Sequence, residues 1–178
     1  MAACQAEKIM KNTLQPSYSY DWTTGWTKQT SLFYFGQRNL LGNTRGYASD
    51  PTVIKDGATY RMFYTGYDQN ISSVGGSIVE VTSSDATNWE YVNQDTPELF
   101  GRVVAARPDQ GKWDENLETA EIVKFNGTYY LYYTGYSNTA HPQLGEGYPA
   151  YIGLARSSDG VNFERYNNGN IVVNSGRN

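Results

Sequence analysis

The chain contains an internal repeat, which constrains its fold more than any other feature of the sequence. Residues 49–67 align without a gap over residues 118–136, and seven of the 19 positions are identical. After a loop of variable length the match resumes between residues 77–92 and 151–166, with six identities in 16 positions. Because extra loop length costs little free energy, two matching blocks in the same order predict a duplicated structural unit.

Each repeat predicts four short antiparallel strands. Asn126-Gly127 in the second repeat is a strong signal for a two-residue hairpin turn. A Ser-Ser-Asp motif recurs between the third and fourth strands, where Asp85 or Asp159 is suited to accept backbone N–H bonds. The expected strands are 52–55, 60–67, 78–82 and 89–92 in the first repeat, and 121–125, 129–136, 151–156 and 163–166 in the second.

The strand pattern predicts an all-β fold. Tyr, Trp and Phe make up 15% of the chain, which also contains 18 glycines, and this composition favours short strands joined by tight turns. A four-stranded antiparallel unit repeated with aromatic motifs is typical of a β-propeller blade. We therefore expect about two four-stranded blades, residues 49–92 and 118–166, within a partial propeller domain that spans residues 22–178.

The segments outside the two repeats carry weaker signals. Residues 25–37 are expected to be the last strands of a preceding blade, and residues 170–173 the start of a following one. Residues 1–21 are polar and aperiodic, which predicts a flexible leader or arm. The segment ending at Cys4 resembles the tail of a bacterial lipoprotein cleavage site, which favours a secreted, periplasmic or lipid-anchored protein. It has no apolar region of an export signal, so an ordinary flexible start is the alternative and the location stays unknown.

Charge and composition exclude several classes of function. The net charge is −4 and the isoelectric point about 5.0, without a cluster of Lys or Arg, so nucleic acid is not an expected partner. No apolar run is long enough to span a bilayer. One cysteine (Cys4) and one histidine (His141) exclude an intrachain disulfide and a Cys/His zinc site. We expect no cofactor, although a structural cation such as calcium stays open.

Three segments resemble a known family. They are YASDPTVI, WDENLETAEIVKFNGTYYLYYTGY and IGLARSSDGVNFER, and they are similar to the five-bladed β-propeller glycoside hydrolases, above all glycoside hydrolase family 43 with its arabinanases and xylosidases. The resemblance covers residues 46–173. It implies hydrolysis of a poly- or oligosaccharide by an Asp base, a Glu acid and an Asp that tunes pKa and orientation, all placed around a central funnel.

The resemblance implies roles for three carboxylates. Asp50 in Asp-Pro matches the general base, and Glu118 matches the catalytic acid. The same segment read against another blade of the family instead places the second carboxylate at Glu121. Strand alternation favours Glu121 as the geometric partner of Asp50, whereas a bulge at the strand end would break that alternation in favour of Glu118. The family also places its acid two blades after its base, whereas these motifs lie on consecutive blades.

Three further residues are candidates for substrate binding, each with a structural alternative. Trp113, with Asp114 beside it, is suited to stack on a sugar ring or to cap the junction between blades. Arg107 is suited to hold a hydroxyl or carboxylate of the ligand or to pair with a structural acid. His141 is expected in a loop at the rim, where a solvated side chain is the ordinary outcome.

Three functions fit these observations. The first is a glycosidase acting on a carbohydrate, the second a non-catalytic carbohydrate-binding propeller, and the third an inactive or assembling half-propeller. Two blades alone leave sheet faces and strand edges unpaired. We therefore expect the chain to form a homo-oligomer or to associate with a complementing chain.

Overall fold

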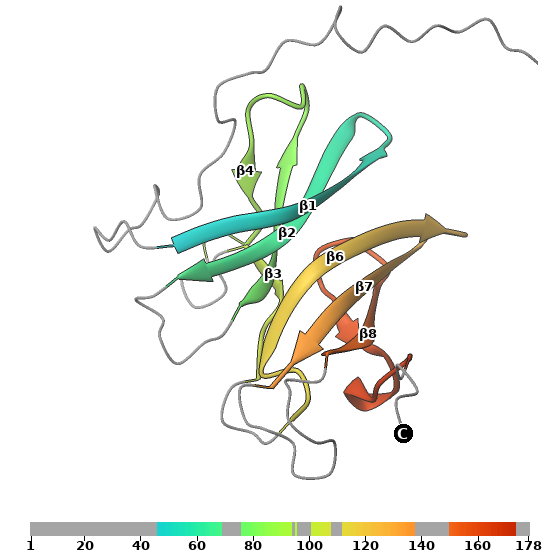
Figure 1. Cartoon of the computed structure of the whole chain (residues 1–178). Coiled ribbons are helices and arrows are strands. Elements are labelled where there is room, and N and C mark those ends of the chain that lie inside the picture. The colour runs from blue at the N-terminus through green and yellow to red at the C-terminus, as the bar shows by residue number, and fades with distance from the viewer. Residues whose placement is uncertain are drawn as a thin grey trace, which may run out of the picture. The chain divides into compact units, whose positions relative to one another are not determined.

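The computed structural model describes residues 46–68, 76–93, 95, 101–107, 112–137 and 150–173. Within these ranges the chain forms β-strands and a short 3-10 helix (Figure 1), as expected for an all-β fold. The predicted arm at residues 1–21, the predicted strands at residues 25–37 and His141 lie outside the described residues.

The first repeat forms an antiparallel sheet. Its strands are β1 (Gly46–Asp56), β2 (Thr59–Asp68), β3 (Ser77–Ser83) and β4 (Glu90–Tyr91), which pair in that order. A short fifth strand, β5 (Arg102–Val104), pairs with the first half of β3, whereas β4 pairs with the second half. The four strands expected for this repeat are therefore present, and β1 begins before the predicted first strand.

The second repeat forms a sheet with the same order. Its strands are β6 (Asn116–Phe125), β7 (Thr128–Tyr136), β8 (Ala150–Ser157) and β9 (Glu164–Arg165), followed by the 3-10 helix η2 (Tyr166–Gly169). The duplication is confirmed at the level of strand pairing, because β1–β4 and β6–β9 each form an antiparallel meander in the same order.

Among the described residues, the segment 170–173 pairs with the second sheet. Val173 pairs with Ile152 of β8, just as Val104 of β5 pairs with Ile78 of β3. Ile78 and Ile152 occupy equivalent positions in the two repeats. The segment therefore completes the outer edge of the second sheet, because a short β9 leaves that part of β8 unpaired.

A bulge interrupts the first strand of each sheet at the same place. The register shifts between Ser49 and Thr52 in the first sheet, and between Glu118 and Glu121 in the second. Asp50 and Thr119 occupy equivalent positions in these bulges and have φ values of 52° and 50°. An L-residue in this left-handed region costs about 1 kcal/mol, so the repeat preserves a strained backbone feature and not only a strand pattern.

The Ser-Ser-Asp turns form as predicted. Asp85 Oδ1 accepts hydrogen bonds from the backbone N–H groups of Thr87 and Asn88 at 2.8 and 2.7 Å. Asp159 Oδ1 accepts the equivalent bonds from Val161 and Asn162. Hydrogen bonds, chiefly from the backbone of Asn88 and Asn162, hold the pKa of both carboxyl groups well below the usual range. Their role in the structure is to close the turn before the last strand.

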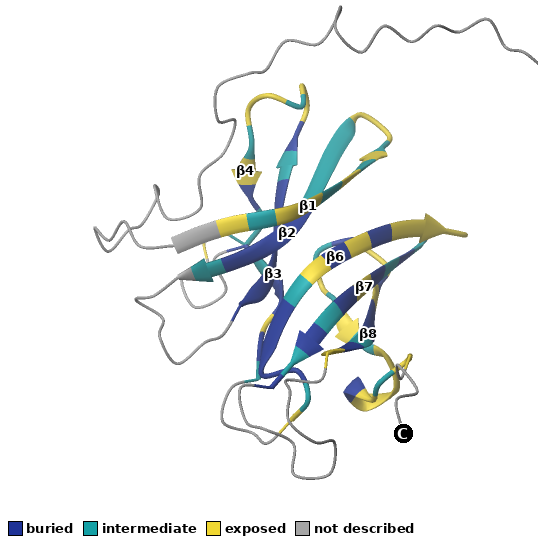
Figure 2. Cartoon of the chain, in the orientation of Figure 1, coloured by how far each residue is buried: buried dark blue, intermediate teal, exposed yellow. Residues whose placement is uncertain are grey.

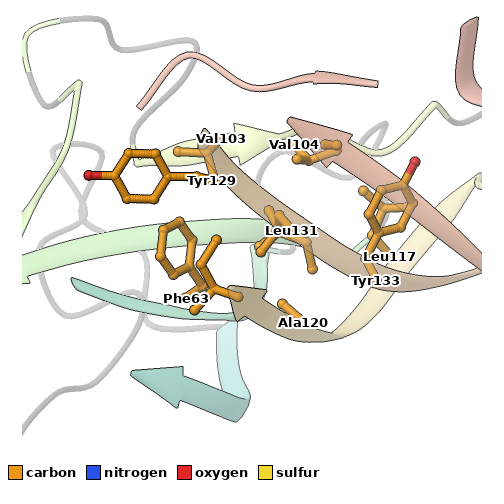
Figure 3. Packing of buried hydrophobic residues seen from close by; sticks show 11 residues of the cluster. Phe63, Val103, Val104, Leu117, Ala120, Tyr129, Leu131 and Tyr133 are labelled. Carbon is orange, nitrogen blue, oxygen red and sulfur yellow. The ribbon is translucent and has the colours of Figure 1, made fainter. Parts of the chain in front are cut away.

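A shared hydrophobic cluster joins the two sheets. Phe63 and Ile78 of the first sheet pack with Leu117, Leu131 and other residues of the second, and these four side chains are fully buried. Figure 3 shows Phe63, Leu117 and Leu131 of this cluster, and Figure 2 shows the burial along each strand. We call this cluster the inter-sheet core. Its members are Phe63, Ile78, Val103, Val104, Leu117, Ala120, Ile122, Tyr129, Leu131, Tyr133 and Ala155.

Charged side chains cross between the sheets beside this core. Asp56 accepts hydrogen bonds from Lys124 Nζ at 2.5 Å and from the Tyr129 hydroxyl, and these bonds lower the pKa of its carboxyl group. Within the first sheet, Arg61 of β2 forms an ion pair with the fully buried Glu80 of β3 at 2.5 Å. Burial raises the pKa of Glu80 to about 7, although the guanidinium of Arg61 acts in the opposite direction.

Candidate functional site

The first candidate carboxylate, Asp50, lies in the bulge of β1. Its side chain is exposed, and Ser49 Oγ donates a hydrogen bond to Asp50 Oδ2 at 3.1 Å. The left-handed backbone at Asp50 turns the chain away from the regular pleat. The direction of the Asp50 side chain therefore depends on the bulge and does not follow from the alternation of a regular strand.

The bulge of the second sheet bonds to the first sheet beside the bulge of β1. The backbone N–H of Thr119 donates a hydrogen bond of 2.9 Å to Thr65 Oγ1, and the fully buried Thr65 is the cross-strand partner of Ser49. Thr65 thus pairs with Ser49, the residue before Asp50, and accepts a hydrogen bond from Thr119, the residue after Glu118. We call the region formed by Ser49, Asp50, Thr65, Glu118 and Thr119 the bulge border.

The two candidate glutamates lie on the same face of the second sheet. Glu118 pairs with Thr134 and Glu121 with Tyr132, and residues two apart on β7 share one face. The bulge thus removes the parity argument that favoured Glu121 from sequence.

The environments of these two glutamates differ. Glu118 is half-buried, and Glu118 Oε1 accepts a hydrogen bond of 2.9 Å from the Tyr136 hydroxyl. Glu121 is exposed. Glu118 is therefore the one of the two whose carboxylate a neighbouring hydroxyl orients at the bulge border.

Asp114 and Arg107 form a buried ionic cluster with a third residue. Asp114 is fully buried, and its Oδ1 accepts bonds from Arg107 Nε at 2.8 Å and Nη2 at 2.5 Å. Asp114 Oδ2 accepts a bond from Arg165 Nε at 2.8 Å. Both carboxylate oxygens are thus engaged, which favours the structural alternative for this pair. Sequence reasoning missed Arg165, because a short last strand gives no signal that its side chain reaches back to Asp114.

Trp113 packs within the second sheet. Its ring stacks on Tyr133 with centroids 6.0 Å apart and meets Tyr151 edge-on. The indole N–H donates a hydrogen bond of 2.8 Å to the carbonyl of Gly169 in η2. These contacts also favour packing over ligand stacking. Direct contact of Trp113, Arg107 and Asp114 with a substrate stays a prediction.

A metal site and a membrane span receive no support from the described ranges. Among these residues, no group of three or more His, Cys, Asp and Glu side chains is arranged to hold a metal ion. In the same part of the chain, no helix has the length and apolarity needed to cross a bilayer.

Solved structures share the arrangement of the two sheets. No protein-family model matches the sequence. A family 117 glycoside hydrolase of the marine bacterium Zobellia galactanivorans superposes on 74% of this chain with a TM-score of 0.53 and 21% identity. The chain has the fold of the β-propeller glycoside hydrolases. This confirms the fold expected from the sequence resemblance and leaves activity to be tested, since identity this low carries the fold alone.

Two further structures give similar matches. A candidate glycoside hydrolase from Parabacteroides distasonis covers 68% of this chain with a TM-score of 0.50 and 17% identity. The α-L-arabinanase of Cellvibrio cellulosa covers 74%, with a TM-score of 0.48 and 22% identity. The matched part makes up 41%, 34% and 37% of the three proteins. The chain therefore spans well under half the length of these propeller proteins.

Proposed function

We propose that the bulge border binds a carbohydrate and takes part in hydrolysis of its glycosidic bond. The observation that carries this proposal is the hydrogen bond from the Thr119 N–H to Thr65 Oγ1. It joins the residue after Glu118 to Thr65, the cross-strand partner of Ser49, so a candidate carboxylate of each repeat is next in sequence to a residue at one inter-sheet contact. Support also comes from the fold, which is that of a family 117 glycoside hydrolase over part of its length.

In this proposal Asp50 acts as general base and Glu118 as general acid. Glycoside hydrolysis requires one carboxylic acid to protonate the leaving oxygen and a second carboxylate to act on a water or on the sugar. Exposure of Asp50 gives water access to its carboxylate. The Tyr136 hydroxyl holds the carboxylate of Glu118 in a fixed orientation. The third carboxylate implied by the family resemblance would come from a further sheet of the propeller.

Hydrolysis of nitrophenyl arabinofuranosides and xylosides by the purified chain tests this proposal. We expect turnover that falls at least ~100-fold in Asp50→Asn and in Glu118→Gln, the loss typical of a general acid or base. Glu121→Gln is expected to retain most of the activity, and the exposed Asp95→Asn serves as a matched control. Absence of turnover in a folded wild-type chain would overturn the proposal of catalysis by this chain.

The exposure of Asp50 supports a second candidate, which is carbohydrate binding without catalysis. An exposed carboxylate is suited to accept hydrogen bonds from sugar hydroxyl groups. Glycan-array binding that is lost in Asp50→Asn, in a protein that hydrolyses none of the test substrates, would select this candidate. Absence of both binding and turnover in a folded wild-type chain would overturn both candidates.

A further inference from the structure

Four turns of the chain contain an asparagine or aspartate followed by glycine, and all four lie in the described residues. Because glycine has no Cβ, its backbone nitrogen has little steric hindrance when it approaches the side-chain carbonyl carbon (Cγ) of the residue before it. Bond formation between these two atoms closes a cyclic imide, which water then opens. The four pairs are Asp56-Gly57, Asn126-Gly127, Asp159-Gly160 and Asn168-Gly169.

The two aspartates are protected from this reaction by their hydrogen bonds. Asp56 accepts bonds from Lys124 Nζ and from the Tyr129 hydroxyl, and Asp159 Oδ1 accepts bonds from two backbone N–H groups of its own turn. These bonds lower the pKa of both carboxyl groups. Ring closure at an aspartate expels water from a protonated carboxyl group, so an ionised and engaged carboxylate reacts slowly.

The pair Asn168-Gly169 is restrained at its glycine. Gly169 is buried, and its carbonyl accepts hydrogen bonds from Trp113 Nε1 at 2.8 Å and from Arg107 Nη2 at 3.5 Å. A Cβ added at Gly169 would lie 2.9 Å from Arg107 Nη2. The backbone of Gly169 therefore cannot turn toward the Asn168 side chain unless these bonds break.

The pair Asn126-Gly127 has a similar backbone without these restraints. Its φ values are 48° and 80°, against 57° and 77° at Asn168-Gly169. Both residues are exposed at the tip of the β6–β7 hairpin (Figure 2). Among the described residues, no atom of another segment lies within 4 Å of a Cβ built on Gly127. The strand ladder ends before the turn, at the pair Phe125–Thr128, so local opening of this turn costs little free energy.

We propose that Asn126 is a site of spontaneous deamidation and that the other three pairs are stable in the folded chain. The backbone nitrogen of Gly127 bonds to Cγ of Asn126, its proton passes to the side-chain amide nitrogen, and ammonia leaves. Water then opens the imide at either carbonyl group, which leaves aspartate or isoaspartate at position 126. This inference does not depend on carbohydrate binding.

The modification would act on a contact between the two sheets. Isoaspartate adds a methylene group to the backbone of a two-residue turn, and the turn geometry fixes the register of the strands that it joins. Lys124, which pairs with Tyr129 next to the last pair of this ladder, bonds to Asp56 of the first sheet. We therefore expect isoaspartate at position 126 to weaken the Lys124–Asp56 contact, whereas aspartate keeps the backbone intact.

Incubation of the full chain in mildly alkaline buffer, followed by peptide mass spectrometry, tests the proposal. Deamidation is measured as the mass gain from amide to acid, and isoaspartate by methyltransferase labelling. We expect Asn126 to react at least ~10-fold faster than Asn168, because the latter must first lose the bonds to the Gly169 carbonyl. Equal rates at the two asparagines, or faster isoaspartate formation at Asp56 or Asp159, would overturn the proposal.

The same incubation in guanidinium chloride is the control, since the two asparagines precede the same residue type and should then react at similar rates. An unchanged rate ratio would show that the fold does not cause the difference, which would overturn the argument. The effect on the sheets is measured by urea denaturation of the deamidated fraction, isolated by anion exchange. We expect a lower midpoint than for the fresh chain and for Asn126→Asp. Equal midpoints would contradict the expected weakening of the Lys124–Asp56 contact.

Discussion

At the scale of single residues, Asp114 shows how a carboxylate next to a conspicuous aromatic residue serves packing. Sequence reasoning placed it beside Trp113 as a candidate for ligand contact, with a structural alternative for its neighbours. The structure buries it completely and surrounds it with Arg107 and Arg165. Spacing along the chain cannot distinguish the two roles, because the decisive partner Arg165 is distant in sequence.

We expect Asp114→Ala to lower the free energy of unfolding by about 3–5 kcal/mol, because it leaves two partly buried guanidinium groups without their partner. Urea denaturation monitored by tryptophan fluorescence measures this change. Asp95→Ala is the control, since its exposed side chain predicts a change within about 0.5 kcal/mol. Equal stability of the two variants would contradict the structural role.

Glu80 predicts a specific pH dependence of stability. Burial raises its pKa in the folded chain to about 7, from an ordinary value of 4.5, so the folded state binds a proton that the unfolded state has released between these values. Stability from this group is therefore present below about pH 4.5 and is lost as pH rises toward 7, by up to about 3 kcal/mol.

Urea denaturation from pH 4.5 to 7.5 measures the effect of Glu80. The wild type is expected to lose stability across this range relative to Glu80→Gln, which retains the size of the side chain but does not titrate. The neighbouring groups Asp56, Arg61, Lys124, Tyr129 and Asp159 are unchanged in both proteins. Parallel stability curves for the two proteins would show that Glu80 does not titrate in this range.

At the scale of elements, the strands and turns were predictable, whereas the bulges were predictable only in outline. Alternation of apolar residues and the Asn126-Gly127 turn predicted the paired strands. A bulge was expected near Glu118, but the left-handed backbone at Asp50 and Thr119 gives no composition signal, since neither position is glycine. The bulge border also depends on a contact between sheets, which a pattern within one strand does not encode.

The hydrogen bond between the sheets predicts a cost for Thr65→Val. This change keeps the shape of the side chain but removes the acceptor for the Thr119 N–H, and we expect stability to fall by about 1–2 kcal/mol. Thr65→Ser retains the hydroxyl and is the matched control. Amide exchange at Thr119, measured by NMR, is expected to be faster in Thr65→Val but not in Thr65→Ser, which would assign the loss of stability to this hydrogen bond. Unchanged exchange there would contradict this contact.

Close packing around Trp113 predicts a second effect on an element. A Cβ added at Gly153 would lie 2.5 Å from the ring of Tyr133 and 2.7 Å from that of Trp113. We expect Gly153→Ala to cost more than about 2 kcal/mol in stability and to alter tryptophan fluorescence, because β8 has to move away from the ring. Gly57→Ala, at a turn with open space around it but φ of 61°, should cost only about 1 kcal/mol.

At the scale of the whole molecule, the duplication was the strongest prediction that the sequence allowed. It predicted two sheets of like topology, and the structure adds that they pack through non-equivalent faces, since Phe63 lies in their shared core whereas its equivalent Tyr132 is exposed. Residues 170–173 were expected to start a following blade, but Val173 pairs with Ile152 of the second sheet. The sequence pattern within one segment does not show with which strand that segment pairs. The roles of Asp50, Glu118 and Glu121 stay predictions, since a resemblance identifies positions and not their reactivity.

The proposed function requires carboxylates from consecutive repeats to serve one carbohydrate site at the bulge border. A crystal structure of the chain soaked with an arabino- or xylo-oligosaccharide shows whether they do. We predict sugar density within hydrogen-bond distance of both Asp50 and Glu118. Density that lies only elsewhere, for example on Trp113, would contradict the proposal.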